Sequence, residues 1–417
     1  MPAKRPIESK PAKAKLVKAK PAANAKPAAK KPAANAKPVA TVNAQPSGDI
    51  AWTPKLRGKI FASRANPNAL HLTGGMHDGP MWVPDDVPYP YTVDAAWTEA
   101  LDRTWSLAEW ARPPNSIPVG YRSAPPELAA IARAALEAFG TRLDALDAQT
   151  EAAMMVLGLR PSWIGMPLWI AMHGATFATR VMVTAARWRN NEGSSGKHRE
   201  QGLHLIEDGL CAGREVHEHA TAWRILRGVL AIADESELAA AREVADAARK
   251  TLPFEQHAAI AFAFADEAWC KDAIDAYLAT EARGVDTSGT WESWQMLIAT
   301  ATIDDALRIA RMEYPLEQSY ALTMLAKHGL ETPRLIAAMF DTFAQVSRFR
   351  ILGDVLAMIR TRDALEAFVP VLGISAVKVP MTRAFKAQPA LGKKLLAKPA
   401  VKADKAGKTA AAILAKL

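Results

Sequence analysis

The sequence predicts an all-α fold, a solenoid-like stack of helix pairs that follows an irregular aromatic cap and a disordered basic tail. The central part is rich in strong helix formers, above all Ala, Leu, Met, Glu and Arg. From Pro126 onward, apolar residues recur at three- and four-residue spacing, whereas no stretch alternates convincingly with a period of two. The connections between the predicted helices are two to six residues long. Such short connections indicate that consecutive helices are antiparallel neighbours, as in stacked helix pairs.

Charge divides the chain into distinct parts. Residues 1–48 carry a net charge of +10 and residues 386–417 one of +7, although the whole chain carries only +9. The part between these ends is therefore acidic, with a net charge of −8. We expect a disordered tail over 1–48, the aromatic cap over 49–125, a helical-repeat body over 126–385, and basic terminal helices over 386–417 that cap the array. Any attraction to polyanions is then assigned to the two ends.

The tail has the composition of a disordered segment. The run KPAANAKP occurs at 20–27 and again at 31–38, and five Lys-Pro steps punctuate the tail. Proline removes backbone donors and disfavours a helical conformation of the preceding residue, and almost no aliphatic side chains offset the entropy of folding. No apolar stretch of a secretory signal is present in the tail.

In composition alone, the tail resembles the Lys/Ala/Pro-rich arms of linker histones and of bacterial histone-like proteins. The resemblance implies sequence-independent binding of nucleic-acid phosphates by interchangeable cations. These cations are Lys4, Arg5, Lys10, Lys13, Lys15, Lys18, Lys20, Lys26, Lys30, Lys31 and Lys37. The alternative is a passive leader that only keeps the protein soluble.

The aromatic cap is rich in Pro, Gly and Trp. Five tryptophans lie in it, and its prolines prevent long regular elements apart from one helix near 93–111. Large aromatic side chains in a Pro-rich segment usually anchor it to a core, so we expect the cap to pack on the helical body. An aromatic surface that binds a ligand is the alternative.

The body contains a series of predicted helices after a first amphipathic helix that includes Leu128, Ile131 and Phe139. The uncharged run 161–179 approaches the length of a membrane span, but Pro167, Gly174 and several polar residues inside it favour a buried central helix. Asp272, Asp305 and Asp363 are each followed by Ala and an aliphatic residue, and each is expected to open a helix. The predicted helices cover 148–158, 165–189, 199–232, 235–250, 255–268, 270–281, 289–300, 303–312, 316–328, 332–345, 348–360 and 362–371.

The last part of the body and the C-terminal end carry a second resemblance. The runs 349–356, 362–365, 369–372 and 384–391 are similar to HEAT-type helical repeats of large uncharacterised bacterial proteins. The resemblance implies an α-solenoid and no defined activity. Further on, an apolar stripe predicts an ordered terminal helix, with Lys398, Lys402 and Lys405 on its solvent side. The stripe consists of Ala406, Ala410, Ile413, Leu414 and Leu417. These lysines serve either the solubility of a capping repeat or contacts with phosphates.

Candidate chemistry is sparse in this sequence. On a helix over 199–232, one face would present His204, Asp208, Cys211, Glu215 and His219, which are metal-ligand types at helical spacing. The opposite face is apolar, so the same stripe is also the natural solvent-exposed side of such a helix. The run 193–198 departs from the phosphate-binding loop pattern, and no nucleophile elbow is present. Two cysteines cannot form a disulfide framework, which is typical of a reducing cytoplasm.

These observations predict a non-enzymatic interaction or scaffold protein of the cytoplasm, without a cofactor or a membrane segment. Its helical surface would bind a protein or peptide, while the tail would associate with DNA, RNA or another polyanion. The alternative is an enzyme or metal-binding protein whose site lies between the cap, with His71 and His77, and the helix over 199–232.

Overall fold

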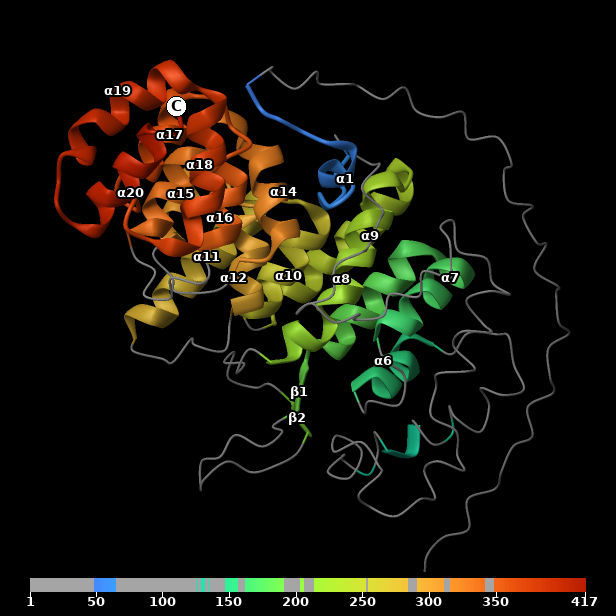
Figure 1. Cartoon of the computed structure of the whole chain (residues 1–417). Coiled ribbons are helices and arrows are strands. Elements are labelled where there is room, and N and C mark those ends of the chain that lie inside the picture. Colours follow the sequence, from blue (N-terminus) through green and yellow to red (C-terminus); the bar gives the residue numbers. More distant parts are fainter. Residues whose placement is uncertain are drawn as a thin grey trace, which may run out of the picture. The chain divides into compact units, whose positions relative to one another are not determined.

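The computed structural model describes nine stretches of the chain in continuous form (Figure 1). They are 49–64, 147–156, 162–190, 203–205, 214–252, 254–283, 291–310, 316–341 and 349–417, with single residues between 126 and 134. All of them belong to one compact unit that spans 44–417, and residues 1–43 are a separate unit outside the described residues. The predictions for the tail, for the helix near 93–111 and for most of the aromatic cap therefore lie outside the described residues.

The described part of the chain is predominantly helical, which confirms the all-α prediction. The helices of its first half are α1 (Pro54–Arg57), α6 (Ala148–Val156), α7 (Ser162–Ala185), α8 (Arg214–Ile232), α9 (Glu235–Arg249), α10 (Phe254–Phe264), α11 (Glu267–Ala282) and α12 (Trp291–Ile298). Those of its second half are α13 (Ile303–Ile309), α14 (Gln318–His328), α15 (Thr332–Phe340), α16 (Phe349–Leu356), α17 (Arg362–Phe368), α18 (Lys378–Ala387), α19 (Pro389–Ala400) and α20 (Lys405–Leu414).

Side-chain caps explain where several of these helices begin. Asp234, Asp266, Thr302, Thr361 and Asp404 each precede a helix and accept a hydrogen bond from a backbone amide of its first turn. They start α9, α11, α13, α17 and α20 in that order. Such caps satisfy amides that have no partner inside the helix, and they are the reason why most predicted boundaries lie close to the observed ones.

The helix predicted over 199–232 is wrong in its first half. Residues 203–205 instead form a short strand, β2 (Leu203–Leu205), which pairs antiparallel with β1 (Trp188–Asn190). His204 lies opposite Arg189 in this hairpin, and α8 begins only at Arg214. Three residues are too short for an alternating pattern to be recognised in the sequence.

The helix α7, which covers most of the uncharged run 161–179, is interrupted at Gly174. Gly174 has a φ of +82°, and a Cβ atom there would lie 2.7 Å from the carboxylate of Glu237 on α9. That carboxylate accepts a hydrogen bond from the amide of Thr176 at 2.7 Å, so α9 satisfies the backbone where the helix is interrupted. No helix of the described stretches combines the length and apolar character that crossing a bilayer requires.

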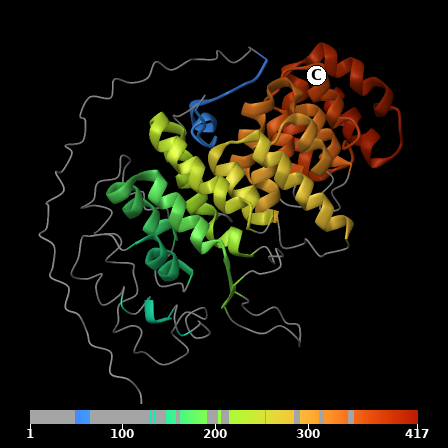
Figure 2. The ribbon, with the colours of Figure 1, turned by 180° about the vertical axis from the view of Figure 1, so that it is seen from behind.

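From α8 onward, helices that are two apart in the chain lie side by side. Contacts join α8, α10, α12, α14, α16, α18 and α20 in one row, and α11, α13, α15, α17 and α19 in a second row. Figures 1 and 2 show these helices coloured in chain order from two sides. Large apolar side chains such as Trp223, Trp294 and Phe368 are fully buried in this part.

The C-terminal end is ordered and helical, but Lys398, Lys402 and Lys405 do not lie on one terminal helix. The chain turns at 401–404, so that Lys398 lies on α19, Lys402 in the turn and Lys405 at the start of α20. All three lysines are exposed, as predicted. Of the expected apolar stripe, Ala410 and Ile413 are buried.

Candidate interaction surface

Residues 49–64, which we call the N-terminal strap, run across helices that are far away in sequence. At its first end the backbone of the strap pairs with the turn between α16 and α17. The amide of Arg360 donates to the carbonyl oxygen of Asp49 at 2.6 Å, and the amide of Ala51 donates to that of Met358 at 2.8 Å. Ile50 and Ile359 form an isolated antiparallel bridge between these two segments.

The other end of the strap is bound by α14, α8 and the start of α9. The amide of Phe61 donates to the hydroxyl of Thr323 on α14 at 2.9 Å. The guanidinium of Arg227 on α8 donates to the carbonyl oxygen of Ala62 at 2.8 Å. Arg64 then reaches the carbonyl oxygen of Ala233 and pairs with Glu235. The two ends of the strap are thus bound largely through their backbone, as extended peptides are, while its middle forms helix α1.

Aromatic packing also anchors the second end of the strap. The ring of Phe61 meets that of Phe262 on α10 at 5.0 Å and that of Tyr320 on α14 at 4.8 Å between centroids. Its neighbours Ile60 and Ala62 are buried. We call the residues of α8, α10, α14 and the turn 358–360 that contact the strap the strap face. The strap is the described part of the predicted aromatic cap, and it packs on α8, α10 and α14.

A buried ionic cluster adjoins the strap face through Tyr320. The Arg224 guanidinium on α8 donates to the carboxylate of Glu292 on α12 at 2.9 Å, to Glu317 at 3.3 Å and to the hydroxyl of Tyr320 at 3.2 Å. The Tyr320 hydroxyl itself donates to Glu292. Burial disfavours the charge of Arg224, but the surrounding acidic groups outweigh it and raise its pKa. Burial also raises the pKa of Tyr320 well above its usual value.

Arg227 is a second buried cation on α8, and its described polar partners carry no formal charge. Besides Ala62, it donates to the carbonyl oxygen of Phe262 at 2.6 Å and to the hydroxyl of Thr300 at 3.4 Å. Burial lowers its pKa to about 10, so it stays protonated at neutral pH. Because a buried charge needs several hydrogen bonds, a carbonyl group supplied by the strap helps to hold Arg227 in place.

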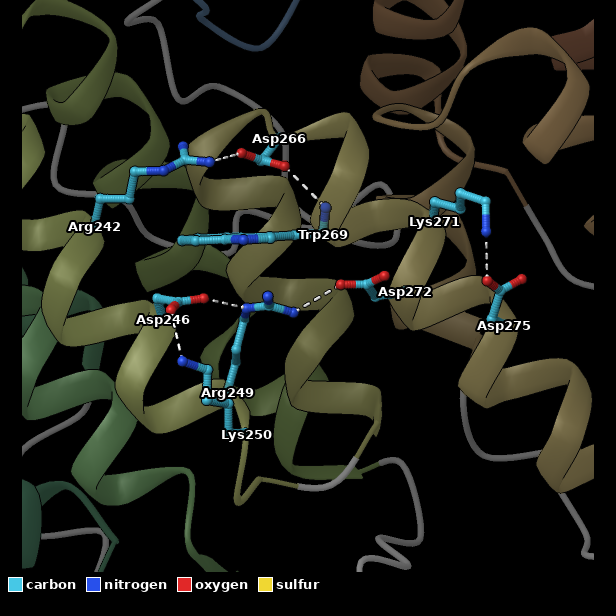
Figure 3. Close-up of polar contacts among 9 residues, drawn as sticks. All are labelled: Arg242, Asp246, Arg249, Lys250, Asp266, Trp269, Lys271, Asp272 and Asp275. Atoms are coloured by element: carbon cyan, nitrogen blue, oxygen red, sulfur yellow. Dashed lines mark hydrogen bonds and ion pairs between the residues drawn. The ribbon is translucent and has the colours of Figure 1, made fainter.

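A charged seam joins α9 to α11 (Figure 3). The indole of Trp269 lies between two guanidinium groups, with that of Arg242 at 4.4 Å and that of Arg249 at 5.0 Å from the ring centroid. Arg242 pairs with Asp266, and Arg249 bridges Asp246 and Asp272 at 2.8 and 2.9 Å. The seam combines cation–π contacts with ion pairs, and it stabilises the contact between two helices.

Similar pairs continue along the following helices. Arg308 on α13 pairs with Asp275 on α11 at 2.7 Å, and Arg334 on α15 with Asp304 on α13 at 3.6 Å. The sequence predicts that Asp272 opens a helix, which is wrong, because α11 begins five residues earlier at Glu267. The carboxylate of Asp272 serves as a partner of Arg249 instead. These charges compensate one another and form no cluster that points to catalysis.

The candidate metal ligands that the structure describes do not share one helix, and Glu215 lies near the start of α8. His204 lies in β2, whereas His219 lies on α8 with its Nδ1 atom 3.2 Å from the hydroxyl of Ser162. The described stretches hold no group of three or more His, Cys, Asp or Glu side chains that could bind a metal ion. Outside the described residues lie Asp208, Cys211, His71, His77 and the eleven tail cations.

Comparison of the chain with protein-family models, with curated proteins and with solved structures gives no match.

Proposed function

We propose that this protein is a non-enzymatic scaffold whose helical-repeat body binds an extended segment of a protein partner, and whose basic tail associates with nucleic acid or another polyanion. In this proposal the two rows of helices are a solenoid of the HEAT-like kind. The side-by-side packing of helices two apart in the chain supports it, since each unit of a solenoid contacts only its neighbours.

The observation that carries the proposal is the binding of the strap. Its backbone is hydrogen-bonded at both ends, and at the second end the ring of Phe61 packs against those of Phe262 and Tyr320. The strap face binds the two ends of the strap through donors, acceptors and an apolar site, and these are the groups that an extended segment of another chain needs. In this view the strap occupies the face until a partner competes for it.

A peptide-exchange experiment tests the body. A fluorescent peptide with the sequence of residues 49–64 is titrated into the wild-type chain and into an Ile60→Ala, Phe61→Ala variant, whose own strap loses the buried Ile60 side chain and the aromatic contacts of Phe61. We expect the peptide to bind the variant at least about ten-fold more tightly, because the strap of the wild type keeps the face occupied. A Lys55→Ala, Arg57→Ala variant, changed at two exposed strap positions, serves as the matched control.

Equal binding by all three chains, or none by the folded Ile60/Phe61 variant, contradicts the peptide-binding role. A scrambled peptide of the same composition distinguishes recognition of the sequence from general stickiness. Circular dichroism at each titration temperature confirms that the variant is still helical.

A salt titration tests the tail. Binding of a fluorescent DNA duplex is compared between the wild type and a tail-neutral chain, in which the eleven tail cations are replaced by Gln. If the tail neutralises about ten phosphates, log K falls with log salt at a slope near −9, and the tail-neutral chain loses most of that slope. A wild-type slope shallower than about −3, or the same binding by both chains, refutes the role of the tail.

A further inference from the structure

The helices at the C-terminal end present a dense set of exposed lysines on ordered backbone. We define the lysine face as the eight lysines of residues 386–417. They are Lys386, Lys393, Lys394, Lys398, Lys402, Lys405, Lys408 and Lys416. Every one of them is exposed in the structure. The single acidic residue of this region, Asp404, is already used, because its side chain accepts a hydrogen bond from the amide of Gly407 at the start of α20.

These lysines differ in their partners from the basic residues of the acidic helices. On α9, α11 and α13 the exposed cations Lys250, Lys271 and Arg308 are each paired with an aspartate. Among the described residues, no ion pair involves a lysine of the lysine face. The lysine face therefore carries charge that nothing in the described part of the chain compensates.

Charge is polarised along the helical array as a whole. Residues 233–317 contain 17 acidic and 7 basic residues, whereas residues 342–417 contain 14 basic and 4 acidic ones. The first stretch holds α9 to α13 and has a net charge of −10, and the second holds α16 to α20 and has one of +10. Attraction of an anion is therefore focused on one end of the array.

The residue types of the lysine face indicate the kind of anion. Lysine is a compact point charge, and residues 386–417 contain no Arg that could read a guanine edge with two hydrogen bonds. The only aromatic residue of α18 to α20, Phe385, is fully buried, so the helices offer no ring on which a base could stack. These features fit the phosphate backbone of a duplex.

An anionic membrane fits this end less well. Among the larger apolar side chains of these helices, Phe385, Leu396 and Ile413 are buried, and Leu391, Leu395 and Leu414 are partly buried against the core. Only Val379 and Val401 are strongly exposed there, at 75% and 85%. Two isolated valines are too little for the apolar face that holds a helix in the interface of a bilayer.

We propose that the lysine face is a second site for nucleic-acid phosphates, which binds duplexes without sequence preference and independently of the tail. The proposal rests on the polyanion-binding part of the proposed function and extends it.

The test uses the tail-neutral full-length chain, so that the lysine face is measured without the tail. Three lysines are changed in this background, as Lys394→Gln, Lys398→Gln and Lys405→Gln. The matched control removes three exposed, paired cations elsewhere, as Lys250→Gln, Lys271→Gln and Arg334→Gln. Both variants lose three positive charges. Each chain is titrated with a fluorescent duplex of about 20 base pairs between about 50 and 300 mM salt.

We expect the tail-neutral chain to keep salt-dependent binding to duplexes of unrelated sequence. The lysine-face variant should lose at least about ten-fold in affinity at low salt, and its slope of log K against log salt should become shallower by about 2.7, as for three lost phosphate contacts. The control variant should bind like its parent.

Three results overturn the proposal: no duplex binding by the tail-neutral chain at the lowest salt, equal losses in the two variants, or binding to vesicles that contain phosphatidylserine but not to the duplex. A fourth result concerns the tail alone. If the wild type and the tail-neutral chain bind equally, the tail is refuted while the lysine face stands, so the two failures are distinguishable.

Discussion

At the scale of the residue, the buried guanidinium of Arg224 depends on the groups that surround it. Glu292 is fully buried, and its carboxylate accepts hydrogen bonds from both Arg224 and Tyr320. We expect Glu292→Ala to lower the free energy of unfolding by about 3 kcal/mol, because it leaves a buried charge with less compensation. Tyr320→Phe removes hydrogen bonds but no charge, and should cost about 1–2 kcal/mol. Urea unfolding measures both, and equal costs would show that the charge of Glu292 is not what matters.

Two histidines make the stability of the protein depend on pH. Burial lowers the pKa of His219 and of His328 to about 4 in each case, from an ordinary value of 6.5. The unfolded chain therefore binds more protons than the folded one between these values, and stability falls as the pH drops from 6.5 towards 4. Between pH 7 and pH 5 we expect a loss of about 1–2 kcal/mol for each histidine. Urea midpoints at the two pH values test this, and His328→Gln should reduce the difference. An unchanged difference in that variant would contradict the assignment.

At the scale of the element, the sequence predicts helices well and their partners poorly. Caps such as Asp234 and Thr361 are local signals, so the starts of α9 and α17 could be predicted. The end of α10 could not, because Ala265 adopts a φ of +50° there without a glycine to mark the turn. The hairpin of β1 and β2 is too short to have a pattern. The seam between α9 and α11 joins residues 23 or 24 positions apart, and no periodicity indicates such pairs.

The seam itself gives a prediction about how two helices are held together. The side chain of Arg249 is 19% exposed and combines two ion pairs with a stacking contact on Trp269. We expect Arg249→Ala to destabilise the protein by about 1–2 kcal/mol. Arg350→Ala is the control, because the Arg350 side chain is 78% exposed and lies 4.0 Å from the carboxylate of Asp354. The loss of this side chain should cost less than about 0.5 kcal/mol of unfolding free energy. Thermal unfolding of both variants compares them, and a control as costly as Arg249→Ala would argue against the stacked arrangement.

At the scale of the whole molecule, composition and charge predict the helical class and the basic, ordered end at 386–417. They do not predict the strap face. The contacts of the strap join residues 165 positions apart, as for Ala62 and Arg227, or 262 apart, as for Phe61 and Thr323. Nothing in the local sequence specifies a partner at such a distance. The same limit applies to the candidate site, because nothing in the sequence specifies which face of the helices would bind the proposed peptide.

The arrangement of the helices predicts how a loss at one end spreads through the molecule. Buried residues Gly407, Ala410 and Ile413 attach α20 to its neighbours, and among the described elements α20 contacts α18 and α19. If stability is a sum of contacts between neighbouring units, a chain that ends after Lys402 should lose amide protection in α18 and α19 but keep it in α10 and α12. Hydrogen exchange followed by mass spectrometry resolves these helices separately. A uniform loss of protection would instead mean that the array unfolds as one cooperative unit, and the solenoid part of the proposed function would then fail. A loss confined to the end would support that part, and it would allow three lysines of the lysine face, Lys405, Lys408 and Lys416, to be removed without disturbing the strap face.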